Sequence, residues 1–174
     1  PGAEIAAMAD WPDRRILDLF GIHIPILQAP MAGPSTPAMA IAVSEAGGLG
    51  SLACAQLSMD EAREAVNAIR AGTSHALNLN FFCHAPPAVD DPRLRPWRQA
   101  MAAYYVEQGL DPGMEPPQAV RRPFDDEACR LVEECRPQVV SFHLGLPARD
   151  LLDRVKRAGA RVIGSATTVP EAGW

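Results

Sequence analysis

Residues 26–33 read Ile-Leu-Gln-Ala-Pro-Met-Ala-Gly, and this stretch decides the fold. The apolar run from Ile24 to Ala29 begins with a β-branched residue and stops at Pro30, which has no N–H for a central ladder. A buried strand ending in a tight loop is therefore predicted. Thr36 followed by Pro37 is typical of a helix N-cap with proline in the first turn. Strand, short loop and capped helix together predict a βα unit.

The same alternation recurs along the chain. Further strands are predicted at 48–52, 76–82, 139–145 and 161–167, and helices at 37–46, 58–71, 125–136 and 147–158, with the first turn of another from Thr168. Short connections between alternating strands and helices indicate an α/β fold with a parallel sheet and helices outside it.

Two architectures fit this alternation. A doubly wound sheet usually carries G-x-G-x-x-G after its first strand, whereas this chain has Ala-Pro-Met-Ala-Gly-Pro at 29–34. A TIM-type (β/α)₈ barrel needs about 250 residues, so the chain would hold an incomplete barrel of about five βα units with its parallel strands in sequential order. The residues at the strand ends must decide between them.

Composition narrows the class of protein. The chain has 174 residues, 48% of them apolar and 21% charged, which is typical of a soluble domain with a real core. A net charge of −5 without long charge runs argues against nucleic-acid or membrane-surface partners, and no apolar run reaches membrane-spanning length. The first residues lack the pattern of a signal peptide, so a cytoplasmic location is expected.

Three segments are expected along the chain. Residues 1–13 form a flexible lead-in, and residues 14–174 form the partial barrel. A proline-rich insertion at 84–124 holds eight prolines around an amphipathic piece at 97–108, and it is long enough to serve as a lid or a partner surface.

The cysteines and histidines do not have metal-ligand spacing. Cys54, Cys83, Cys129 and Cys135 form no C-x-x-C pair, and the four histidines form no H-x-x-x-H pair. Free thiols and no metal site are therefore expected.

The predicted strand ends share a chemical character. They consist of amides, hydroxyls, small residues and one histidine, without a carboxylate, and they lie at 28–33, 51–54, 80–84, 141–145 and 164–168. Such a rim suits a large, flat, hydrogen-bonding ligand, because ligands bind at the carboxyl ends of parallel strands. Ser141 and Ser165 have no visible general base, so a serine nucleophile is not expected.

Four residues at or next to this rim are candidates for ligand contact. Asn78 and Asn80 stand at period two on one strand face, where buried amides need partners. His143 lies near the end of its strand. Met31, between Pro30 and Gly33, is placed to cover a flat ring.

Five segments in register carry a resemblance to a known family. They are Pro-Ile-Leu-Gln-Ala-Pro-Met-Ala-Gly at 25–33, Ala-Gly-Gly-Leu-Gly-Ser at 46–51, Asn-Leu-Asn-Phe-Phe-Cys-His at 78–84, Val-Ser-Phe-His-Leu-Gly at 140–145 and Ala-Thr-Thr at 166–168. Together they resemble the N-terminal half of the bacterial nitronate monooxygenases, formerly called 2-nitropropane dioxygenases.

The resemblance implies an FMN-dependent TIM barrel that oxidises alkyl nitronates with O₂. It places Ala29, Pro30 and Met31 against the isoalloxazine ring, Asn80 in contact with flavin or substrate, and His143 beside the active site. The family's catalytic base is a histidine in a Gly-Gly-His-Arg-Gly-like segment, and neither that segment nor the later phosphate-binding loops occur in these 174 residues. The chain alone is therefore expected to bind FMN weakly or not at all and to lack activity.

Two other interpretations of the sequence remain open. A flavin-dependent enoyl-ACP reductase has a similar N-terminal half. A non-catalytic half-barrel interaction module would use its open sheet edge for a partner or for self-association.

Overall fold

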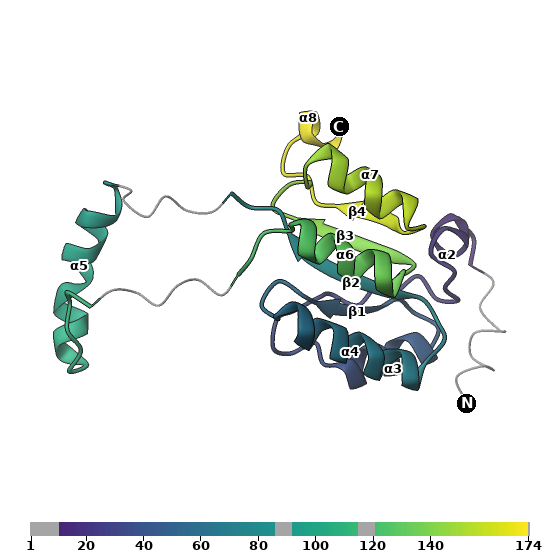
Figure 1. The fold of residues 1–174 in the computed structure, drawn as a ribbon, viewed down its shortest axis with the longest axis horizontal. Helices are drawn as coiled ribbons and strands as arrows, with labels where there is room; N and C mark the ends of the chain where they lie inside the picture. Colours follow the sequence, from purple (N-terminus) through teal and green to yellow (C-terminus); the bar gives the residue numbers. More distant parts are fainter. Residues whose placement is uncertain (1–10, 86–91, 115–120, 174) are drawn as a thin grey trace. The chain divides into compact units, whose positions relative to one another are not determined.

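The computed structural model describes residues 11–85, 92–114 and 121–173 (Figure 1). These residues fall into two compact units, one made of the chain up to His84 and from Arg121 onward, and the other lying within 85–120. In the described ranges, no helix is both long enough and apolar enough to cross a membrane.

A parallel four-stranded sheet organises the first unit (Figure 1). Its strands are β1 (Gly50–Ala53), β2 (Leu77–Phe82), β3 (Val139–His143) and β4 (Arg161–Gly164), and they lie in the order β1-β2-β3-β4. This order confirms the predicted sequential arrangement and excludes the doubly wound sheet, which reverses its strand order. The fold is therefore of the TIM-barrel type.

The helices follow the strands as predicted, with small shifts at their ends. They are α2 (Arg15–Phe20), α3 (Pro37–Glu45), α4 (Met59–Gly72), α6 (Asp126–Cys135), α7 (Arg149–Arg157) and α8 (Val169–Ala172). The Thr36 side chain accepts a hydrogen bond from Met39 N, which confirms the predicted cap of α3. Ser58 and Glu61 form a complete capping box at α4.

The prediction of a full first strand at Ile24–Ala29 is wrong. The segment pairs in parallel with β1's lead-in through one bridge, Leu27 to Leu49. Two hydrogen bonds flank it, from Gln28 N to Leu49 O and from Leu49 N to Ile26 O. Pro25 and Pro30 cannot donate to a ladder, which limits the pairing to this short stretch. Five βα units remain, the first with its strand reduced to a bridge.

The two faces of the sheet bury different clusters. Leu77, Leu79 and Phe81 of β2 pack with α3, α4, α6 and α7 in the larger cluster. Leu49, Val139 and Ile163 pack with Leu17 and Phe20 of α2 in the smaller one. Because side chains alternate along a strand, α2 covers the face opposite the outer helices. That inner face is the one that carries Asn78 and Asn80.

Helix α3 lies unusually close to the start of β1. A Cβ atom added to Gly50 would stand 2.2 Å from the Ala40 carbonyl oxygen and 2.4 Å from Ser44 Oγ. The fully buried Ser44 hydroxyl donates to Ala76 O at 3.0 Å and accepts from Gly50 N at 3.2 Å. The absence of a side chain at Gly50 and the hydrogen bonds of Ser44 thus allow α3 to pack directly against the start of β1.

The second unit contains α5 (Leu94–Glu107), so the amphipathic piece predicted at 97–108 is a helix. None of its residues is buried. Its apolar side chains line a pocket of about 420 Å³ with the segment that follows, and Trp97 is 69% exposed.

Candidate functional site

The loop after the first extended segment is held in one shape by Ser35. Its hydroxyl accepts a hydrogen bond from Met31 N at 2.9 Å and donates to Ala29 O at 3.1 Å, while its own N–H donates to Met31 O. Ser35 is buried, whereas the Met31 side chain is 48% exposed. The loop therefore presents an apolar side chain and exposed backbone on a fixed base at the carboxyl edge of the sheet.

A buried amide and hydroxyl network crosses the inner face of the sheet. Ser141 Oγ on β3 accepts from Asn78 Nδ2 and from Asn80 Nδ2, each at 2.9 Å. Asn80 Nδ2 also reaches Ser141 O at 3.2 Å, and Asn78 Nδ2 reaches Ser51 Oγ on β1 at 3.1 Å. The two asparagines share one face, as their spacing predicted, and Ser141 holds both.

Two buried polar atoms beside this network lack a hydrogen-bond partner among the described residues. They are Asn78 Oδ1 and Gln28 Nε2, one an acceptor and one a donor. Gln28 uses its other amide atom, Oε1, to accept from Ser51 N at 3.0 Å. Since buried polar groups are normally paired, the inner face has hydrogen-bonding capacity left for a ligand or for further chain.

His143 lies at the end of β3 and lines a pocket of about 380 Å³. Its Nδ1 is 2.7 Å from Ser165 Oγ, just past the end of β4, and the Phe82 ring lies 5.8 Å from the imidazole, centre to centre. The expectation that Ser165 lacks a neighbouring base is wrong. The strand register brings the two residues together, and local sequence does not show that register.

The predicted strand ends contain no carboxylate, but Glu171 of α8, outside those ranges, lines the same pocket as His143. Hydrogen bonds from the Thr167 backbone N–H and hydroxyl lower the pKa of Glu171, so the carboxylate is ionised at neutral pH. Its capping-box spacing with Thr168 marked the helix start, but not the pocket.

The remaining histidines and thiols form no hydrogen bond to the His143 and Ser165 side chains within the described ranges. The rings of His23 and His75 contact each other edge-on at the amino ends of the strands. His84 Nδ1 is buried without a partner in the described part of the chain. All four cysteines are free, and burial raises the pKa of Cys54 to about 12 and that of Cys83 to about 11, so neither is a thiolate nucleophile at neutral pH.

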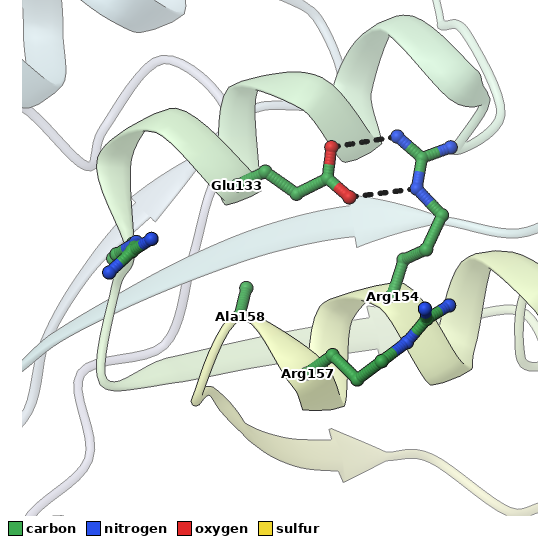
Figure 2. A pocket seen from close by; sticks show the side chains of 5 residues that line it. Glu133, Arg154, Arg157 and Ala158 are labelled. Atoms are coloured by element: carbon green, nitrogen blue, oxygen red, sulfur yellow. Dashed lines mark hydrogen bonds and ion pairs between the residues drawn. The ribbon is translucent and has the colours of Figure 1, made fainter.

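A further pocket, of about 210 Å³, lies on the outside of the sheet between α6 and α7 (Figure 2). Arg154 spans it to Glu133, and Arg136, Arg157 and Ala158 complete the lining. Arg136 follows the last residue of α6 and Arg157 is the last residue of α7. Cations at helix C-termini stabilise the helix dipole, which accounts for these charges without a ligand.

The sequence matches the family model for nitronate monooxygenase over residues 13–174. The chain belongs to the nitronate monooxygenase family. It is 41% identical over 160 residues to a nitronate monooxygenase of Paraburkholderia phytofirmans, covering 91% of this chain and 44% of that protein. It is 40% identical to one of Pseudomonas aeruginosa, covering 91% and 45%. The chain thus spans under half the length of these relatives.

Two solved structures are similar to this chain in fold. A nitroalkane oxidase from Streptomyces ansochromogenes superposes with a TM-score of 0.75 at 32% identity, over 90% of this chain and 44% of that one. FabK from Thermotoga maritima superposes less closely, with a TM-score of 0.65 at 25% identity, over 91% and 39%. The nitronate monooxygenases are oxidoreductases, and this chain corresponds to their N-terminal half.

Proposed function

We propose that this chain supplies the isoalloxazine-facing wall of an FMN site in a nitronate monooxygenase that oxidises alkyl nitronates with O₂. The observation that carries the proposal is the Ala29–Met31 loop, which Ser35 fixes at the carboxyl edge of a TIM-type sheet. Family membership supplies the reaction class.

The residues present suit a flat heteroaromatic ring. Met31 and Leu144 offer exposed apolar surface at the strand ends, at 48% and 52%. Asn78 Oδ1 and Gln28 Nε2 are buried and have no hydrogen-bond partner within the described ranges. Apolar surface with a few placed polar groups is the usual composition of a cofactor site.

The candidate residues have three different roles in this proposal. Ala29, Pro30 and Met31 hold one side of the ring through backbone and side-chain contact. Asn80 has its Nδ2 engaged by Ser141, which leaves Oδ1 to accept a hydrogen bond from flavin or nitronate. His143 donates or accepts a hydrogen bond at the substrate. Bound FMN supplies the electron-transfer chemistry that these side chains lack.

The catalytic base lies outside this assignment. The 174 residues contain no Gly-Gly-His-Arg-Gly-like segment, so we expect the chain alone to bind FMN weakly and to show no O₂ uptake with propionate 3-nitronate. A yellow, stoichiometrically flavinylated preparation of this chain that turns over the nitronate would contradict that expectation.

A chimera tests the function itself. The full chain is continued by the part of the P. phytofirmans relative that lies beyond the aligned region. We expect this chimera to bind FMN and to consume O₂ with propionate 3-nitronate. The chimera with Met31→Asp places a charge against the ring and should lose flavin, whereas the chimera with Met39→Asp, changed at an exposed methionine of α3, should keep it. Equal flavin affinity in both variants would refute the assignment of Met31.

A second candidate, a flavin-dependent enoyl-ACP reductase, is favoured by the superposition on FabK. It predicts that the same chimera consumes NADH in the presence of a crotonyl thioester. Because the nitroalkane oxidase superposes more closely, we expect O₂ uptake without a nicotinamide.

A further inference from the structure

His143 and Ser165 form a pair that the strand register creates. Phe142 of β3 lies opposite Gly164 of β4, so the next residues along the two strands, His143 and Ser165, also face each other. Ser165 Oγ lies 2.7 Å from His143 Nδ1, and both residues line the 380 Å³ pocket.

The contact between Ser165 Oγ and His143 Nδ1 fits either neutral form of the imidazole, and the direction of the hydrogen bond follows the form that is present. A neutral imidazole has one N–H and one acceptor nitrogen, and a serine hydroxyl can donate to the acceptor. When Ser165 donates to Nδ1, the proton of the neutral ring stays on Nε2, which is also the form that a free histidine side chain prefers. Nε2 has no partner among the described residues, so its N–H is available to a ligand.

The His143 ring is exposed and contacts one neighbouring aromatic ring. Phe82 packs against it, and Leu144 and Gly145 turn the chain away from β3 with positive φ angles of 64° and 107°. The charged group that lines the same pocket is Glu171, whose Oε2 is occupied by hydrogen bonds from Thr167. Among the described residues, no hydrogen bond or ion pair joins Glu171 to His143.

We propose that Ser165 is a positioning residue that holds His143 in its Nε2–H form, so that Nε2–H donates a hydrogen bond to an oxygen of the nitronate substrate. The assignment rests on the proposed function, because it needs the nitronate at the ends of β3 and β4. A pocket of about 380 Å³ is within the usual size range for small-molecule sites.

Imidazole NMR on the uniformly ¹⁵N-labelled full chain tests the proton's location without flavin or turnover. The spectrum holds only four histidines, and His143→Gln identifies the signal of interest. At about pH 8, where histidine is neutral, we expect Nδ1 of His143 to show an acceptor shift and Nε2 a protonated one. Ser165→Ala should move both shifts toward the tautomer mixture of a free histidine side chain, in which Nε2–H still predominates, and Ser165→Thr should restore them. His23 and His75, at the opposite end of the strands, serve as internal controls.

Ser165 is exposed, so the alanine variant leaves the core intact, and the amide spectrum verifies the fold. A protonated Nδ1 in the unmodified chain, or an unchanged ring spectrum in Ser165→Ala, would overturn the proposal. In the chimera, Ser165→Ala should raise KM for propionate 3-nitronate, but by less than the roughly tenfold rise expected when one hydrogen bond to a charged ligand is lost, because His143 remains and still favours Nε2–H, and Ser165→Thr should leave KM unchanged. An unchanged KM would also overturn it. Flavin absorbance of the same samples reports on the proposed function separately.

Discussion

Arg154 of α7 donates two parallel hydrogen bonds to Glu133 of α6, from Nε to Oε1 at 2.8 Å and from Nη2 to Oε2 at 2.7 Å (Figure 2). A third contact, from Nη1, reaches Asp126 at the start of α6. One guanidinium thus ties together two helices that pack side by side on the sheet. Such bidentate pairs add geometric specificity to charge.

This pair predicts an acid-sensitive contribution to stability. Hydrogen bonds from Arg154 lower the pKa of both Glu133 and Asp126. Because the folded-state pKa values lie below the unfolded ones, the contribution is complete above the ordinary carboxyl range and is lost as the pH falls through the lowered values. We expect the Tm to decline below about pH 4, and Arg154→Gln to flatten that decline. Arg149→Gln, at an exposed arginine of the same helix, is the control. A decline that is equally steep in both variants would contradict the assignment.

The contact between α3 and β1 predicts a strong sensitivity to one added methyl group. Gly50→Ala would drive its Cβ into the Ala40 carbonyl and Ser44 Oγ, and we expect a loss of about 3 kcal/mol, at the upper end for overpacking. Gly164→Ala is the control, because its Cβ meets only the flexible end of Leu146. Urea denaturation of both variants gives the comparison, and similar midpoints would show that α3 is free to move away.

Features set by residues close in sequence were predictable. The caps at Thr36 and Ser58 depend on a hydroxyl and a backbone N–H three residues apart, and that spacing is visible in the sequence. The common face of Asn78 and Asn80 follows from the strand period in the same way. Sequential strand order required the resemblance as well, since alternation alone also fits a doubly wound sheet.

Features set by strand register were not predictable. Ser141 is 61 residues from Asn80, and Ser165 is 22 residues from His143, so neither contact has a local signal. The first strand was predicted too long. Its apolar run is typical of a strand, but Pro25 and Pro30 cannot donate backbone hydrogen bonds, and a single bridge forms. Glu171 was readable as a cap residue, but its place in the pocket depends on the loop after β4.

The hydrogen bonds of the Ser141 hydroxyl predict that the protein loses stability when this hydroxyl is removed. Ser141→Ala removes one of the two acceptors of each amide nitrogen, while Asn78 Nδ2 keeps Ser51 Oγ and Asn80 Nδ2 keeps the backbone oxygen of residue 141. We expect the free energy of unfolding to fall by about 1 kcal/mol, the low end of the range for a buried donor that loses a partner. Ser74→Ala, at an exposed position, should be neutral within about 0.5 kcal/mol. Thermal and urea unfolding measure both. A neutral Ser141→Ala would mean that the amides find other partners.

Ser35, which holds the Ala29–Met31 loop through two side-chain hydrogen bonds, has no flavin contact in our assignment. We nevertheless predict that flavin affinity depends on it. Ser35→Ala removes the partner of Met31 N and of Ala29 O. In the chimera we expect FMN to bind up to about thirtyfold more weakly, since each of the two released hydrogen bonds is worth about 1 kcal/mol to the ordered loop. Flavin fluorescence quenching measures the affinity, with Ser74→Ala as the control. Unchanged affinity would show that the loop holds its shape without these hydrogen bonds.

The open edge of β4 predicts self-association of this chain. Arg161 N donates inward to Gln138 O, and successive residues of a strand turn their N–H groups to opposite edges, so Val162 N–H faces outward. No described residue pairs with that edge. An unpaired strand edge can pair with a strand of another molecule, so we expect the sedimentation coefficient to rise with protein concentration.

Val162→Pro removes the outward donor and leaves the ladder to β3 intact, and it should shift the sample toward monomer. Trp97→Ala, on the exposed face of α5, separates this mechanism from association through apolar side chains. If Trp97→Ala gives the monomer and Val162→Pro does not, association runs through α5 instead of the sheet.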